Sequence, residues 1–481
     1  MKPLNRPGLF KIAALLAMLA VAAGCATNPV SGRSDFVLMS EQREIALGAQ
    51  NHQQILKQYK VYEHPQLQQY VNEVGQKLAQ QSHRNHLEFR FTLLDSPEVN
   101  AFALPGGYIY ITRGIMAYMN NEEQLAGVLG HEIGHVTARH GVRQQSAQVA
   151  AGIIGLIATI ASGDKQVAEA SNQLGDVLIS GYGRNHELEA DRLGAEYLAR
   201  TDYDPEKMLG VVGILKNQEE FELQRAREEG REPRVYHGVF STHPRNDRRL
   251  QEVIRAADKF KNPDARATDP ENFLRLMNEV AFGESEEQGI IRENKFYHKA
   301  MDFVVAFPQD WRIENQPNQL VAIRADGAAA MIVNTAQLEG GESTAQFLNR
   351  KFSNLQKGQS VDGGGYTGIA TGKHPLGDGP YRVVTVPHQG YVFVVAGFAK
   401  SQRPDQLFVD TATSIRKLKN SEHTLAQAQK IRLLRAKSGD TFALLAKQTD
   451  LGRFAEERLR LLNGLYPDGE PANGQLIKII Q

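Results

Sequence analysis

The string HEIGH at residues 131–135 combines side chains that can hold a metal ion and move a proton. Residues four apart share one face of an α-helix, so His131 and His135 can direct ring nitrogens at the same ion. Zn²⁺ takes such nitrogens at about 2.0–2.1 Å. The Glu132 carboxylate lies beside the first ligand and can take a proton from a water that attacks a carbonyl. The pattern favours a metal-dependent hydrolase over a solvent-facing helix with two unrelated histidines.

A catalytic zinc site needs a third protein ligand and one open position. Glu187 and Asp191 are four apart on a predicted helix and therefore share a face. We expect Glu187 to bind the metal and Asp191 to accept the second N–H of a ligand histidine. Glu189 is expected to face elsewhere. The alternative interpretation of this run is an acidic, solvated helix face.

His140 is a second candidate for the third ligand, and the spacing argues against it. It follows His131 by nine residues. On a continuous helix that is about 900° of rotation, which places it on the opposite face. We therefore expect His140 to be a structural residue or a cap near the end of the helix.

The composition is that of a globular chain with several domains. The 481 residues are 41% hydrophobic and 23% charged, with 55 basic and 55 acidic side chains. This excludes a disordered chain, and the zero formal charge argues against nucleic acid as a partner. The single cysteine excludes an intramolecular disulfide and cysteine-based zinc fingers.

Residues 1–24 resemble an export signal, with three basic residues followed by an uncharged apolar run. Small residues then precede Cys25, as at a bacterial lipoprotein cleavage site, although Ala22 stands where that pattern usually has Leu. The resemblance implies that Cys25 is lipidated, and Ala26 after it favours the outer membrane. The alternative is an ordinary cleaved signal peptide with an incidental cysteine.

Apolar periodicity predicts a multidomain α+β protein. Residues 25–287 form a mainly helical domain with a small sheet, residues 288–420 an α+β sheet module of unassigned role, and residues 421–481 a small βααβ module. In the first domain we expect helices over 41–59, 65–82, 122–143, 176–224 and 244–259, and strands within 87–94 and 100–112. The apolar stretch 149–161 is either a core helix or a membrane-facing lid.

Four strings resemble the CAAX-prenyl-protease/HtpX-type zinc metallopeptidases, and among these the soluble periplasmic BepA-like branch. They are NAFALPGG at 100–107, HEIGH at 131–135, ELEAD at 187–191 and THP at 242–244. The resemblance spans residues 28–260. It implies a gluzincin-type domain, one Zn²⁺ per chain, Glu187 as third ligand and Asp191 as the partner of a ligand histidine.

The same resemblance implies that His243 and Arg249 lie near the site and act in catalysis. His243 would either stabilise the tetrahedral intermediate or occupy the open metal position in a latent state. On the residues alone, His243 is a lone histidine before a proline. Asn100, Ala101 and Phe102 would hold the substrate as an added β-strand.

The last module, 421–481, resembles a LysM module. The strings GDT at 439–441, LLNG at 461–464 and GQLIKI at 474–479 carry the likeness. LysM modules bind N-acetylglucosamine-containing glycans, so peptidoglycan is implied as a partner. The alternative is a small βααβ domain that binds nothing.

Together these features predict a zinc-dependent endopeptidase, lipid-anchored in the periplasm and attached to the outer membrane. Its expected substrates are misfolded or stalled envelope proteins, cleaved with loose sequence preference. Two alternatives retain the fold without proteolysis: a chaperone or assembly factor, and a peptidoglycan-associated scaffold.

Overall fold

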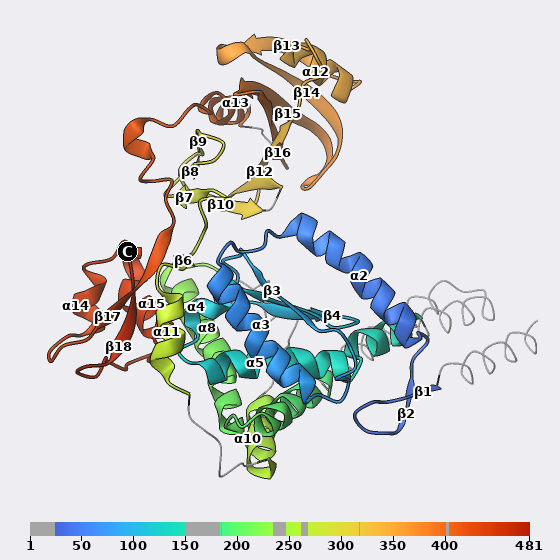
Figure 1. Ribbon diagram of the computed structural model, residues 1–481. Coiled ribbons are helices and arrows are strands. Elements are labelled where there is room, and N and C mark those ends of the chain that lie inside the picture. The colour runs from blue at the N-terminus through green and yellow to red at the C-terminus, as the bar shows by residue number, and fades with distance from the viewer. Residues whose placement is uncertain are drawn as a thin grey trace, which may run out of the picture. The chain divides into compact units, whose positions relative to one another are not determined.

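The computed structural model describes residues 25–149, 183, 185–233, 247–260, 268–316, 318–400 and 404–481. The predicted leader, all but Val149 of the apolar stretch 149–161, and His243 lie outside these residues. The chain divides into two compact units, one formed by residues up to Val280 together with Lys430–Gln481, the other by Ala281–Gln429 (Figure 1). This grouping differs from the predicted boundaries at 287/288 and 420/421, and it joins the C-terminal segment to the first unit.

A small three-stranded sheet lies at the centre of the first unit. Its order is β3 (Arg90–Leu94), β5 (Tyr108–Thr112), β4 (Ala101–Leu104), with β3 parallel and β4 antiparallel to β5. The turn between β4 and β5 uses Gly106 and Gly107, both at positive φ, where a side chain would also meet neighbouring backbone. In this order β4 lies at one edge of the sheet, and no strand of the described residues pairs with the outer edge of β4.

Helices cover both faces of this sheet. Helix α2 (Glu41–Gln58), capped by Ser40, packs on the face that carries Tyr108 and Tyr110. Helices α3 (Pro65–Gln80) and α5 (Glu122–Thr137) pack together and contact the strands from the other face. Asn121 caps α5, whose residues are almost all buried, as expected for a helix inside a domain.

Outside this sheet and its covering helices, the described elements of the first unit before Val280 are a short hairpin and several helices. The hairpin is β1 (Cys25–Thr27) with β2 (Ser34–Phe36). The helices are α4 (Arg113–Tyr118), residues 140–149, residues 185–200, the 3-10 turn η1 (Pro205–Lys207), α8 (Met208–Glu228), α10 (Asp247–Lys259) and α11 (Pro270–Met277). Among all described residues, no helix is both long enough and apolar enough to cross a bilayer.

The C-terminal segment has the predicted βααβ order and packs within the first unit. It comprises β17 (Gln429–Arg435), α14 (Phe442–Ala446), the turn η4 (Gly452–Phe454), α15 (Ala455–Leu462) and β18 (Leu476–Ile480), with β17 and β18 antiparallel. The fully buried Lys478 donates from Nζ to the carbonyl oxygens of Ala117 and Met119, at 2.5 and 2.6 Å. Phe454 packs edge-on against Phe221 of α8.

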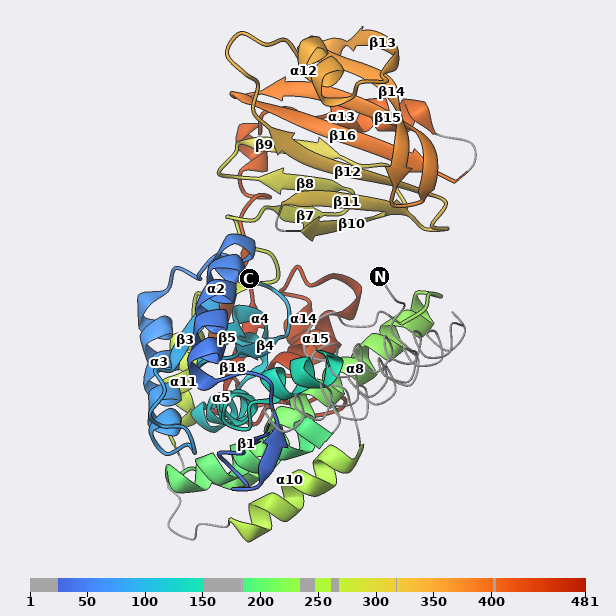
Figure 2. The same ribbon diagram turned by 90° about the vertical axis from the view of Figure 1, so that its right-hand side faces the viewer.

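The second unit is built on a seven-stranded antiparallel sheet (Figure 2). In spatial order the strands are β10 (Trp311–Gln316), β11 (Gln319–Arg324), β12 (Ala329–Ala336), β16 (Tyr391–Ala399), β15 (Gly377–His388), β14 (Gly365–His374) and β13 (Gln356–Val361). A second sheet joins β7 (Ile290–Arg292), β8 (Lys295–His298) and β9 (Phe303–Ala306). The short strand β6 (Ala281–Phe282) begins the unit.

Two helices of the second unit bury opposite faces of its large sheet. Helix α12 (Thr344–Lys351) packs in the cluster that contains Val383, and α13 (Asp405–Thr413) in the cluster that contains Val384. Neighbouring residues on a strand point to opposite faces, so both faces of β15 are covered. The predicted α+β character of this region is therefore confirmed.

Candidate metal centre

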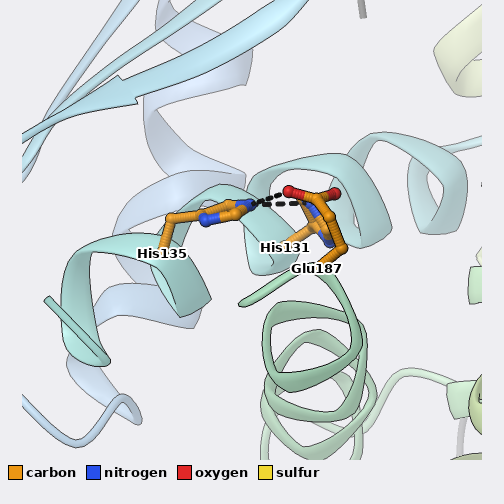
Figure 3. Close-up of side chains that lie close together, drawn as sticks. All are labelled: His131, His135 and Glu187. Atoms are coloured by element: carbon orange, nitrogen blue, oxygen red, sulfur yellow. Dashed lines mark hydrogen bonds and ion pairs between the residues drawn. The ribbon is translucent and has the colours of Figure 1, made fainter. Parts of the chain in front are cut away.

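Three side chains from two helices converge in the first unit. His131 and His135 lie on α5, and Glu187 lies on the helix over residues 185–200 (Figure 3). The two Nε2 atoms are 3.0 Å apart, and Glu187 Oε2 and Oε1 lie 3.5 and 3.4 Å from His131 Nε2 and His135 Nε2. One ligand atom from each of the three lies within 4.8 Å of the others, which is the spacing of a metal site.

The surroundings of His131 leave its Nε2 available as a ligand atom. Its Nδ1 lies 2.9 Å from Oδ1 of the fully buried Asp191. An ionised carboxylate accepts hydrogen bonds and cannot donate, so the ring proton resides on Nδ1 and the lone pair on Nε2. Two imidazole nitrogens and one carboxylate oxygen are a donor set that suits zinc, so the residues present fit that ion.

The electrostatics of the cluster also favour a cation. Burial opposes protonation of His131, but hydrogen bonds and charge from Asp191 and Glu187 outweigh it and raise its pKa above the ordinary value. The site thus holds an excess of negative charge. That excess can be neutralised by a proton or, more completely, by a divalent metal ion.

Close packing of small residues brings Glu187 within reach of α5. A side chain at Gly134 would approach Ala190 backbone to 3.1 Å, and one at Gly194 would approach the backbone nitrogen of His131 to 3.1 Å. The helix over 185–200 can therefore lie almost directly against α5. The Glu187 side chain is then long enough to meet both histidines.

Glu132 faces a mainly apolar cavity next to the ligand set. The cavity has a volume of about 20 Å³ and is lined on its apolar side by Ala101, Ile115, Val128, Met208, Val211, Val212 and Leu215. Glu132 is 2% exposed. A carboxylate in such a setting, beside a metal site, can exchange protons with a reacting group without competition from bulk water.

The three residues predicted to bind substrate, at 100–102, differ in what their side chains contact. Ala101 lines the cavity together with Glu132. The backbone of Asn100 pairs with Thr112, and its buried side-chain Oδ1 has no hydrogen-bond partner among the described residues. The Phe102 ring stacks on Tyr110, on the sheet face away from the cavity, so only its backbone is placed to meet an added strand.

His140 does not lie where a continuous helix would put it. Helix α5 ends at Thr137, and Arg139 adopts a positive φ of 55° before the chain turns helical again. As a result His140 Nδ1 lies 2.8 Å from His135 Nδ1, and His140 Nε2 lies 3.1 Å from Glu189 Oε2. The expectation that His140 occupies the far face is wrong because the helix is interrupted. Neither contact had a local signal in the sequence.

Burial sets the protonation of the histidines around the ligands. It holds the pKa of His140 well below the ordinary value, helped by the neighbouring His186 and Arg143. Burial likewise lowers the pKa of His186 to about 4. The two rings stack at 4.1 Å. Both are therefore neutral at pH 7.

The remaining predicted site residues stay predictions. His243 lies outside the described residues, and only the backbone of Arg249 is described, on α10. Cys25 is described through its backbone, which pairs with Phe36 in the β1–β2 hairpin.

Comparison with known proteins agrees with this geometry. Residues 65–257 match the model of Peptidase family M48, so the chain carries a domain of that family. The beta-barrel assembly-enhancing protease of Escherichia coli (strain K12) is 29% identical over 253 residues, covering 50% of this chain and 49% of that protein. The Yersinia pestis protein of the same name is 30% identical over 251 residues, with 50% and 49% covered.

A eukaryotic relative shares the same region. The mitochondrial metalloendopeptidase OMA1 of Saccharomyces cerevisiae is 25% identical over 245 residues, covering 47% of this chain and 67% of that protein. The chain spans about half the length of the assembly-enhancing proteases that it matches. The predicted metallopeptidase domain is thus confirmed for residues 65–257, while the LysM resemblance stays a prediction.

Proposed function

We propose that the protein is a zinc-dependent endopeptidase of the bacterial cell envelope that acts in protein quality control. The observation that carries the proposal is the convergence of His131, His135 and Glu187 beside Glu132. The family match and the relatives named as proteases support it. One zinc ion per chain would be held by the two Nε2 atoms and the Glu187 carboxylate.

Each described residue has a distinct role in this proposal. When bound, the zinc ion would polarise the scissile carbonyl and make the attacking water more acidic. Glu132 takes a proton from the attacking water onto its carboxylate and passes it to the leaving amide nitrogen. Asp191 keeps the His131 proton on Nδ1, and the apolar cavity wall excludes bulk water from Glu132.

The outer edge of β4 would bind the substrate. Its backbone groups can pair with an extended peptide, which adds a fourth strand next to Ala101 and the cavity. Such pairing uses main-chain groups and requires an extended segment. Unfolded or misfolded envelope proteins expose such segments, and the name of the Escherichia coli relative, an assembly-enhancing protease, agrees with that substrate class.

Location and accessory contacts follow from the sequence features. The leader and Cys25 support lipid anchoring in the periplasm, at the outer membrane. The strings in 421–481 support peptidoglycan binding. We retain His243 and Arg249 as catalytic residues because the resemblance to the zinc metallopeptidases, which includes the THP string at 242–244, implies that both lie near the site.

The experiment compares the soluble chain from Ala26 with its Glu132→Gln variant. Zinc content is measured by elemental analysis and activity by cleavage of unfolded casein. We expect one zinc ion per chain in both proteins and cleavage by the wild type alone. Absence of zinc in the wild type, or equal cleavage by the variant, would refute the proposed mechanism. Zinc in both without cleavage in either would favour a binding role.

A further inference from the structure

The two ligand histidines differ in what touches their second ring nitrogen. His131 Nδ1 meets the Asp191 carboxylate at 2.9 Å, the arrangement that the sequence predicted for a ligand histidine. His135 Nδ1 instead meets another imidazole, that of His140, at 2.8 Å. An imidazole is a donor at one nitrogen and an acceptor at the other, so this contact fixes a tautomer only if something fixes His140.

Glu189 supplies that constraint. Its Oε2 lies 3.1 Å from His140 Nε2 and 2.9 Å from Nη1 of Arg143. Arginine has only donors, so Glu189 Oε2 accepts from Arg143 and acts as an acceptor toward His140 as well. His140 Nε2 must therefore carry the ring proton. Stacking on His186 at 4.1 Å, with the rings 10° from parallel, holds the His140 ring in this orientation.

The position of the proton follows along the chain of contacts. With its proton on Nε2, His140 presents a lone pair at Nδ1. His135 must then donate from its own Nδ1, which leaves the lone pair of His135 on Nε2. That atom lies 3.0 Å from His131 Nε2 and 3.4 Å from Glu187 Oε1. The contacts thus prepare His135 Nε2 to bind a metal ion.

The interruption of α5 makes this arrangement possible. On a continuous helix a residue five positions after His135 lies about 500° further round, far from it. The positive φ of Arg139 turns the chain so that His140 comes back beside His135. The helix over 185–200 then contributes Glu187 to the ligand set and Glu189 as the partner of His140 Nε2.

We propose that His140 and Glu189 are positioning residues that hold the proton of His135 on Nδ1, as Asp191 does for His131. The inference rests on the proposed zinc site and extends it. The pair acts through a hydrogen-bond chain, Glu189 to His140 to His135, and touches neither substrate nor the reacting atoms.

The first test measures zinc affinity by competition with a chelator of known affinity. His140→Phe keeps a ring for stacking on His186 and removes the Nδ1 acceptor. We expect zinc binding to weaken about 10- to 100-fold, the usual effect of removing such an outer partner. Glu189→Gln retains an acceptor oxygen, so the loss of zinc affinity in this variant should be smaller. The double variant should resemble His140→Phe, because the two residues act in one chain.

A matched control is His83→Phe. The His83 ring is also partly buried and packs against the helix over 185–200, where its Nδ1 meets the Tyr197 hydroxyl at 2.8 Å. Its Nε2 faces Glu196 and Arg200 at the far end of that helix from Glu187. We expect unchanged zinc affinity for this variant, even if the metal-free protein becomes less stable to the same extent as His140→Phe.

The second test reads the tautomer directly and needs no metal. Long-range ¹H–¹⁵N spectra of the metal-free protein, with ¹⁵N-labelled histidine, assign the proton-bearing nitrogen of each ring. At alkaline pH, where both rings are neutral, we expect the proton on Nδ1 of His131 and of His135 in the wild type. In His140→Phe, His135 should shift to a mixture rich in Nε2–H, while His131 keeps Nδ1–H as an internal reference.

The outcomes separate the inference from the function on which it rests. Unchanged zinc affinity in His140→Phe, or a His135 tautomer that does not change, would overturn the inference. A wild type that binds no zinc would refute the proposed function, yet the metal-free spectra would still test the tautomer. A role in stability alone would lower the melting temperature and leave both readouts unmoved.

Discussion

Two buried polar clusters flank the last turns of α5, and they differ in how their charges are satisfied. In one, Glu44 accepts from Arg84 and Arg139 at 2.7 and 2.8 Å, and Arg84 also donates to the carbonyl of Val136 at 2.9 Å. In the other, His131, His135 and Glu187 face one another. The first cluster pairs cations with carboxylates, while the second gathers lone pairs around a common point.

The difference separates a scaffold from a binding site. Buried ions are costly unless paired, and the charges of the arginine cluster are already paired with carboxylates, so this cluster joins α2 to the end of α5. The histidine cluster becomes equally well compensated only when it takes up positive charge. The raised pKa of His131 is a sign of that demand. We call the group of Glu44, Arg84 and Arg139 the closed cluster, and the group of His131, His135 and Glu187 the open cluster. The paired charges of the closed cluster indicate a structural role, and the converging ligand atoms of the open cluster indicate a binding site.

The largest expected effect comes from the carboxylate beside the open cluster. Glu132→Gln should lower the rate of casein cleavage by about 10²- to 10⁴-fold, the usual contribution of a general acid–base. Zinc content should not change, because Glu132 is outside the ligand set. Steady-state cleavage rates and elemental analysis check this. Simultaneous loss of zinc would instead make Glu132 part of the metal site.

Removing the shared carboxylate of the closed cluster should lower the stability of the fold more than it lowers metal affinity. Glu44→Gln leaves two buried arginines without their shared carboxylate, and we expect a loss of about 3–5 kcal/mol in the unfolding free energy of the first unit. Urea denaturation measures it.

Glu41→Gln is the matched control, since Glu41 is on the same helix and contacts the same Arg84 from a half-exposed position. The loss of unfolding free energy in Glu41→Gln should stay below about 1 kcal/mol. Equal losses for the two variants would show that burial does not distinguish these pairs.

Metal removal should act on the open cluster alone. With free zinc about 100-fold above its dissociation constant, binding stabilises the folded state by about 2.7 kcal/mol, and chelation should remove that contribution. Differential scanning calorimetry with and without EDTA should show a lower transition for the first unit. Chelation should leave the second unit unchanged, and the Glu187→Ala variant should no longer respond.

Lys478 sharpens the comparison as a buried amino group that meets carbonyls rather than carboxylates. Burial holds its pKa well below the ordinary value of 10.5. The folded state therefore binds fewer protons than the unfolded state, and stability should rise with pH until it levels off above about 10.5. The slope reaches at most about 1.4 kcal/mol per pH unit.

The Lys478→Met variant tests this assignment. It should lose that slope, as measured by the difference between variant and wild-type unfolding free energies from pH 7.5 to 9.5. Parallel profiles would mean that Lys478 stays charged in the fold.

The features that the sequence determined alone are those set by local geometry. A four-residue spacing fixes one helix face, so the residue order by itself pairs His131 with His135, and Glu187 with Asp191. Alternation likewise predicted β3, turn residues predicted the Gly106–Gly107 turn that leads into β5, and the cap at Ser40 marked the start of α2. Each of these depends on neighbours within a few residues.

The tertiary structure decided the features that depend on contacts between segments distant in the sequence. The contact of His140 with His135 required a helix break at Arg139, and no local pattern marks a non-glycine residue for positive φ. The reach of Glu187 depended on two helices meeting through Gly134 and Gly194. The C-terminal segment packs within the first unit, where Lys478 donates to a carbonyl of α4 and Phe454 contacts a phenylalanine of α8. Such contacts arise from packing, which sums many weak interactions across the chain and leaves no short-range signature.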